Sequence, residues 1–138
     1  DVVDPVIVII EYNSVFGATR AVAVPYDPLF NCSKAHYSNL FWGSSLKALC
    51  QLGQRKGYAF VGADSHGNNA YFVAQNKLGK LKPITVEEGY VRSKFRESRD
   101  ESGKLTYVSG EQRLQLIKHL QVFDFEKDSL IPLSELSE

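Results

Sequence analysis

The residues best suited to chemistry follow a run of β-branched side chains near the start of the sequence. Residues 6–10 read as a strand, and it ends directly in Glu11, Tyr12 and Asn13. Ligands of open α/β sheets bind at the carboxyl ends of strands, where a carboxylate can accept a hydrogen bond or act as a base. These three residues are therefore candidates for substrate binding. The alternative is that Glu11 and Asn13 cap a neighbouring helix or hold the loop that follows.

A second polar group lies between two predicted strands and contains Asp64, His66 and Asn68. A histidine near an acid suits acid–base chemistry or metal binding. A hairpin turn, however, selects Asp, Gly and Asn on conformational grounds alone. A turn beyond an antiparallel edge strand is also a poor position for catalysis. We favour a structural role for this turn and keep its three residues as weaker candidates.

Two further candidates, His36 and Tyr37, lie in a long irregular segment, residues 14–42. Its prolines and aromatic residues predict an ordered loop, and long ordered loops in small domains often bind ligands. Substrate contact is the functional interpretation of His36, whereas a lone histidine is more often packed in the core. No His or Cys pair has the spacing of a metal site, so we expect no bound metal.

Several motifs that define enzymes are missing from the sequence. Residues 62–67 have the glycine spacing of a phosphate-binding loop, but Asn68 and Asn69 occupy the positions of its Lys and Ser/Thr. No Gly-x-Gly-x-x-Gly follows a strand, and no Gly-x-Ser-x-Gly elbow occurs. The sequence therefore indicates no self-sufficient active site.

Composition and charge narrow the class of protein. The 138 residues fit one domain, 43% are hydrophobic, and 16 basic residues balance 16 acidic ones. A neutral chain gives no reason to expect nucleic acid or a membrane surface as a partner, and no apolar run reaches the roughly 18–20 residues that span a bilayer. Cys32 and Cys50 are too few for a disulfide framework, so we predict reduced thiols in a cytoplasmic protein.

The elements around these residues predict an α/β fold. The opening run of five β-branched residues fits a strand buried on both faces, as in a parallel sheet. A helix follows, from a cap at Ser44 or Ser45 to Gly57. Residues 58–62 and 69–74 then form strands whose short connection requires an antiparallel hairpin. We expect a mostly parallel sheet with one antiparallel strand at its edge.

Two capping boxes predict helices later in the chain. Thr85 and Glu88 open a helix towards Arg96, and Ser109 with Gln112 opens another. We expect the tail, residues 122–138, to form a short strand or to lie along the surface.

The position of the first strand predicts a larger domain. Five residues precede it, and the sequence contains no Met. A parallel strand needs parallel neighbours reached through crossovers. We expect residues 1–76 to be the second half of such a domain and residues 77–138 to be a family-specific helical extension.

Short motifs within residues 6–74 resemble the end of class I S-adenosylmethionine-dependent methyltransferases, and more narrowly the FkbM-type group and related bacterial hypothetical proteins. The motifs are Ile-Glu-Tyr-Asn at residues 10–13 and Lys-Gly-Tyr at residues 56–58. The resemblance implies a partial Rossmann-like methyltransferase sheet, made of a parallel strand, a helix and an antiparallel edge hairpin, with an α-helical C-terminal extension. Of the family's pattern, Glu11 maps to a position near the substrate end of the sheet.

The resemblance also implies a function, methyl transfer in a longer parent protein. The family's cofactor elements, a Gly-rich turn and an acid-tipped strand, have no counterpart here. It therefore implies that S-adenosylmethionine binds to the parent and that this segment binds no cofactor alone. The acceptor would be a small molecule, such as a sugar or another hydroxylated metabolite, held against residues 14–42. The alternative is a non-catalytic α/β interaction or dimerisation module that forms a homo-oligomer. A glycosyltransferase-like domain ranks last because the sequence has no metal-binding Asp-x-Asp.

Overall fold

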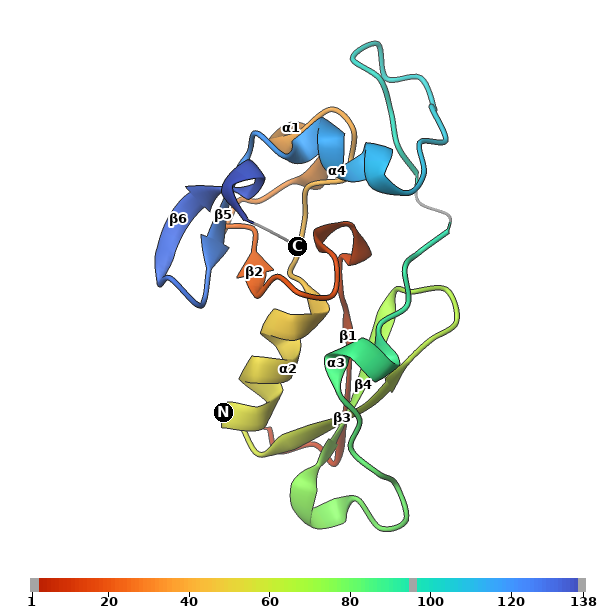
Figure 1. Cartoon of the computed structure of the whole chain (residues 1–138), viewed down its shortest axis with the longest axis vertical. Coiled ribbons are helices and arrows are strands. Elements are labelled where there is room, and N and C mark those ends of the chain that lie inside the picture. The colour runs from red at the N-terminus through yellow and green to blue at the C-terminus, as the bar shows by residue number, and fades with distance from the viewer. Residues whose placement is uncertain (1–2, 95–96, 137–138) are drawn as a thin grey trace.

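Two antiparallel sheets of three strands each organise the part of the chain that the structure describes (Figure 1). The computed structural model describes residues 3–94 and 97–136. The first sheet, sheet A, has the strand order β1 (Ile7–Glu11), β4 (Asn69–Ala74), β3 (Tyr58–Ala63). The second, sheet B, has the order β2 (Val22–Ala23), β5 (Gln121–Asp124), β6 (Ser129–Pro132).

The central strand of sheet A is β4. It pairs with β1 on one side, where Ile7 lies opposite Val73, and with β3 on the other. Both pairings are antiparallel. The β3–β4 hairpin that the sequence predicts is therefore confirmed.

Helix α2 (Leu46–Arg55) covers one face of sheet A. Its N-cap is Ser45, whose side-chain oxygen accepts a hydrogen bond of 3.2 Å from the first turn of the helix. Gly57 follows the helix with a φ of 80°, a left-handed conformation that suits glycine. Both ends agree with the sequence prediction. The buried core between α2 and the sheet consists of Tyr12, Leu46, Leu49, Phe60, Ala70 and Phe72.

Shorter helical segments complete the fold. They are α1 (Cys32–Ala35), α3 (Val86–Gly89), α4 (Glu111–Ile117) and the 3-10 turns η1 (Ser14–Phe16), η2 (Gln75–Lys77) and η3 (Leu133–Glu135). Thr85 and Glu88 form the predicted capping box at the start of α3. The helix ends at Gly89 and does not continue as predicted, and Arg96 lies outside the described residues.

Sheet B and α4 enclose a second core. Its buried residues are Phe16, Val22, Leu40, Phe41, Leu114, Ile117, Val122 and Leu133. The tail forms the β5–β6 hairpin, and β5 also pairs with β2 from the first part of the chain. The predicted capping box at Ser109 is wrong, because Gly110, with a φ of 55°, occupies the N-cap position of α4.

The predicted fold class is wrong. No two described strands pair in parallel, and β4 is the central strand of sheet A, not its edge. The C-terminal part is not a purely helical extension, since it supplies two strands of sheet B. The β-branched run led to this error because it suggested burial on both faces. In the structure, Ile7 and Ile9 are 56% and 59% exposed.

The division of the chain at residue 76 stays a prediction, and the β2–β5 pairing crosses it. Among the described residues, no helix has both the length and the apolar character needed to cross a membrane.

Candidate functional site

The three candidate residues after the first strand have different environments. Glu11 is exposed at the end of β1, where it lies opposite Asn69. Tyr12 and Asn13 are each 1% exposed. Of the three, Glu11 is the residue that can meet a substrate.

Tyr12 ties sheet A to the segment after α3. Its hydroxyl donates a hydrogen bond of 2.7 Å to the carbonyl of Val91 and accepts one of 3.2 Å from the N–H of the same residue. Burial raises the pKa of Tyr12 to about 12. The hydroxyl therefore stays protonated and serves as a structural contact.

Asn13 joins sheet A to the loop that leads into α2. Its side-chain amide donates to the carbonyls of Leu40 and Trp42, at 2.8 and 3.0 Å. Its side-chain oxygen accepts from the N–H of Val15 at 3.1 Å and so caps η1. This is the alternative considered from the sequence, in which Asn13 holds the loop.

His36 and Tyr37 lie together after α1, with ring centroids 4.3 Å apart. The hydroxyl and the backbone N–H of Ser38 both meet His36 Nδ1, at 2.7 and 3.3 Å. Because a backbone N–H can only donate, Nδ1 is an acceptor, and neutral His36 carries its proton on Nε2. Burial lowers the pKa of His36, and the nearby His119 lowers it further. His36 is itself buried, at 9% exposed, so the structure agrees with the alternative that this histidine is packed in the core.

Asp64 closes the turn between β3 and β4. Its carboxylate accepts hydrogen bonds of 2.7–3.3 Å from the backbone of His66, Asn68 and Asn69 and from the side chain of Asn69. Burial acts to raise the pKa of Asp64, but the hydrogen bonds from Asn68, Asn69 and Gly67 together outweigh it and lower the pKa. The carboxylate of Asp64 is therefore occupied by the turn.

The structure brings two of the candidate groups to the same end of sheet A. The N–H of Tyr12 donates to the carbonyl of Asn68 at 2.8 Å, next to the Glu11–Asn69 pair. His36 and Tyr37 instead lie beside His119, which follows α4. Spacing in the sequence gives no sign of either arrangement, because both depend on pairing between distant segments.

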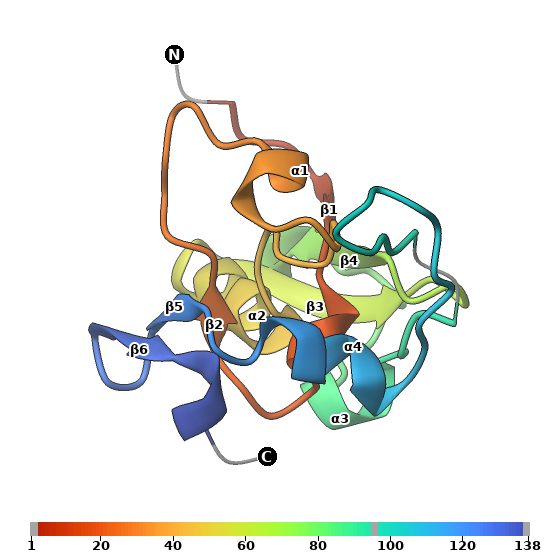
Figure 2. The same ribbon diagram turned by 90° about the horizontal axis from the view of Figure 1, so that it is seen from above.

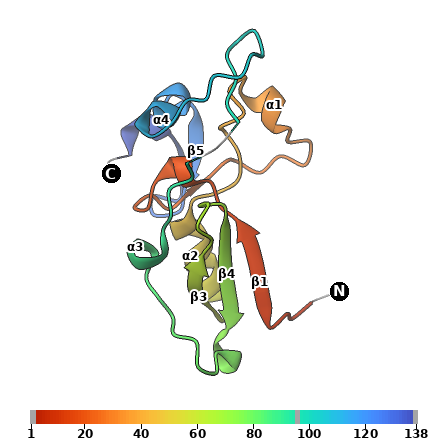
Figure 3. The ribbon, with the colours of Figure 1, turned by 90° about the vertical axis from the view of Figure 1, so that its right-hand side faces the viewer.

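β1 is an outer strand of sheet A (Figure 3), and its residues are more exposed than those of β3 and β4. The carbonyl of Val6 accepts a hydrogen bond of 2.9 Å from the N–H of Ala74, and the N–H of Tyr12 donates one of 2.8 Å to the carbonyl of Asn68. Because alternate residues direct their backbone groups to opposite sides, Ile7, Ile9 and Glu11 direct theirs away from β4. Within the described residues, no strand pairs with this side of β1.

Exposed apolar side chains lie along this strand, and we call Val6, Ile7 and Ile9 the edge surface. Val6, Ile7 and Ile9 are 50–59% exposed, and two residues of a separate loop, Tyr26 and Leu29, are 92% and 86% exposed. The loop between β2 and α1, which carries Tyr26 and Leu29, projects on the same side as β1 (Figures 2 and 3). Large exposed apolar patches mark interaction surfaces. Sequence reasoning placed Tyr26 and Leu29 in the predicted acceptor wall, residues 14–42, but did not predict their exposure, which follows a turn closed by the Phe30 N–H on the carbonyl of Asp27 at 3.0 Å.

Comparison with protein families, curated proteins and solved structures finds no match to this chain. Within residues 3–94 and 97–136, no group of three or more His, Cys, Asp or Glu residues is placed to hold a metal ion.

Proposed function

We propose that this chain is one part of a larger methyltransferase-like protein and joins the remainder through the edge surface. The observation that carries the proposal is the outer edge of β1, whose backbone groups can pair with a further strand. The resemblance of residues 10–13 and 56–58 to class I methyltransferases supports methyl transfer as the activity of that larger protein.

In this proposal the remainder binds S-adenosylmethionine and this chain forms a wall of the acceptor site. The acceptor is a small hydroxylated molecule, such as a sugar. Glu11 contacts it, because an exposed carboxylate at a strand end can accept a hydrogen bond from a hydroxyl group. His36 is buried beside Tyr37 and His119 and takes no part in this proposed contact. We assign the protein to the cytoplasm, since two cysteines are too few for a disulfide framework.

Isothermal titration calorimetry with S-adenosylmethionine tests this activity. We expect binding heat from the parent protein and none from this chain alone. A parent protein that gives no heat with the cofactor or its demethylated product contradicts methyl transfer. The Glu11→Gln variant of the parent should weaken acceptor binding about tenfold and leave cofactor binding unchanged.

The same edge also favours a second candidate, a non-catalytic dimerisation module. Two copies of β1 can pair antiparallel about a two-fold axis and form one continuous sheet. Size-exclusion chromatography with light scattering separates the candidates. A dimer of defined mass supports the module, whereas aggregates of undefined size support an absent partner strand. A monomer at all concentrations contradicts the module.

A further inference from the structure

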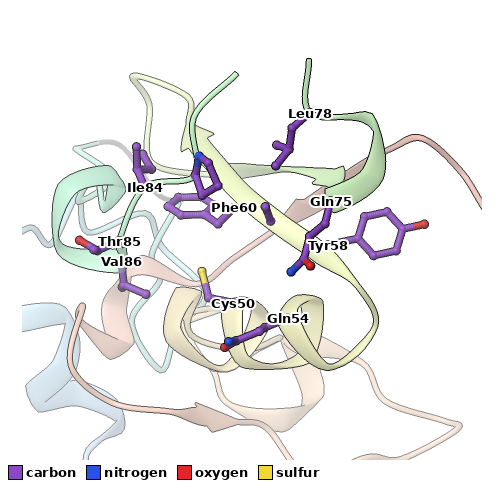
Figure 4. Close-up of a pocket in the computed structure, with 11 residues that line it drawn as sticks. Cys50, Gln54, Tyr58, Phe60, Gln75, Leu78, Ile84, Thr85 and Val86 are labelled. Atoms are coloured by element: carbon purple, nitrogen blue, oxygen red, sulfur yellow. The ribbon is translucent and has the colours of Figure 1, made fainter. Parts of the chain in front are cut away.

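A pocket of about 540 Å³ lies beside β3, the edge strand of sheet A opposite to β1 (Figure 4). It is enclosed by α2, β3 and the segment before α3. Its volume is within the range of small-molecule sites. Figure 4 shows Ile84 and Val86 at one end and Gln54 and Gln75 towards the other. This pocket is independent of the edge surface and of the proposed methyl transfer.

The walls of the pocket are held in place before any ligand binds. The N–H of Ile84 donates to the carbonyl of Phe60 at 3.0 Å, which fixes the segment before α3 across β3. Gly89 of α3 packs directly on the Phe60 ring, where a β-carbon would overlap it. The capping box of Thr85 and Glu88 fixes the start of the same helix. A preformed pocket loses little entropy on binding.

The chemistry of the lining defines the ligand. No charged side chain is among the described residues that line the pocket, and most of its surface is apolar. Gln54 and Gln75, both exposed, line it, and within the described residues no protein group forms a hydrogen bond with either side-chain amide. Each amide can both donate and accept a hydrogen bond. A charged ligand would lose its hydration without gaining an opposite charge.

Cys50 also lines the pocket, and its thiol is not a nucleophile there. Burial, with a smaller contribution from Glu87, raises the pKa of Cys50 to about 12. A protonated thiol in an apolar wall packs as a small hydrophobic group. The pocket is therefore suited to binding and not to covalent chemistry.

We propose that this pocket binds a neutral small molecule with an apolar body and one carboxamide-like group. The apolar body packs between Phe60, Ile84 and Val86. The carboxamide-like group exchanges hydrogen bonds with Gln54 and Gln75.

A titration followed by two-dimensional NMR tests the proposal with three probes of nearly equal shape, benzamide, benzoate and benzamidine. We expect benzamide to shift the backbone signals of Gln54, Phe60 and Gln75 in a saturable manner. Benzoate should bind at least about tenfold more weakly, because no cation lines the pocket and Glu87 is near Cys50. Benzamidine should also bind more weakly than benzamide, because no carboxylate is among the lining residues. Equal binding of a charged probe, or shifts outside the pocket, would overturn the proposal.

A double variant tests the two amides. Gln54→Leu with Gln75→Leu should weaken benzamide binding about tenfold, since two neutral hydrogen bonds are lost. Gln51→Leu, on the same helix but outside the lining, should leave binding unchanged. The dispersion of the NMR signals shows whether each variant is folded. Unchanged binding in a folded double variant would show that the amides do not recognise the ligand.

Discussion

Sheet A and sheet B differ in how their edges are protected. In sheet B, the edge strand β2 is only two residues long. The other edge strand, β6, follows the charged residues Lys127 and Asp128, and its last residue is Pro132. Short strands, prolines and nearby charges hinder pairing with another chain. In contrast, β1 of sheet A has five residues, contains neither Lys nor Pro, and exposes Ile7 and Ile9.

The opposite edge of sheet A, β3, is also protected. A backbone hydrogen bond from Ile84 to Phe60 covers one position, and a bulge between Phe60 and Gly62 interrupts the strand. Among the described edge strands, β1 is thus the least protected, since its one charged residue, Glu11, stands at its end. The difference indicates that β1 is a binding surface, because a finished sheet protects its edges.

The largest effect is expected at the junction of the two sheets, on which the comparison depends. Asn13→Ala removes the amide that donates to the carbonyls of Leu40 and Trp42 in a buried region. We expect a loss of about 3 kcal/mol in the free energy of unfolding, measured by urea titration. The matched control is Asn31→Ala, which removes the cap of the short, exposed helix α1 and should cost about 1 kcal/mol or less. Equal losses would show that Asn13 does not join the sheets.

A charge on β1 tests the difference between the edges directly. Ile9→Lys places an ammonium group in the middle of the apolar edge, so self-association of the chain should weaken about 30-fold, or about 2 kcal/mol. Sedimentation velocity over a range of concentrations measures this. Leu130→Lys on β6, where Leu130 is 52% exposed, should change association less than about twofold. If the unmodified chain is already monomeric, or if both variants behave alike, the two edges do not differ as proposed.

The smallest effect concerns the hairpin of sheet A, whose turn depends on Asp64. The hydrogen bonds to the Asp64 carboxylate lower its pKa, so its ionised form stabilises the fold above the ordinary value of 3.8. This contribution is lost as the pH falls through the lower folded pKa. Asp64→Asn should therefore cost about 1 kcal/mol near pH 7 and less near about pH 2, by thermal unfolding. A pH-independent difference would mean that ionisation of Asp64 does not stabilise the turn.

Short-range signals made part of the fold predictable. The Ser45 cap, Gly57 and the turn at residues 64–68 define α2 and the β3–β4 hairpin without reference to distant residues. Strand pairing could not be predicted in the same way. An apolar run such as residues 6–10 is compatible both with a strand buried on two faces and with a strand that has one open face. The order of strands in sheet A depends on which distant segment β1 meets.

The candidate site shows the same limit. Strand alternation alone indicates that Tyr12 and Glu11 point to opposite faces, so the burial of Tyr12 was accessible from the sequence. The role of Asn13 was not, because its partners Leu40 and Trp42 depend on the path of the intervening loop. The lining of the pocket is likewise drawn from separate segments, among them Gln54 and Gln75.

The register of sheet A also determines the order in which the sheet can form. The turn at residues 64–68 joins β3 and β4, whereas Ile7 must find Val73 across most of the first half of the chain. Closing a short loop costs less entropy and is faster, so we expect the hairpin to form before β1 docks. During that interval the exposed edge belongs to β4. Docking of β1 then moves the unpaired edge outward by one strand and does not remove it, so the folded sheet still has one edge open to pairing.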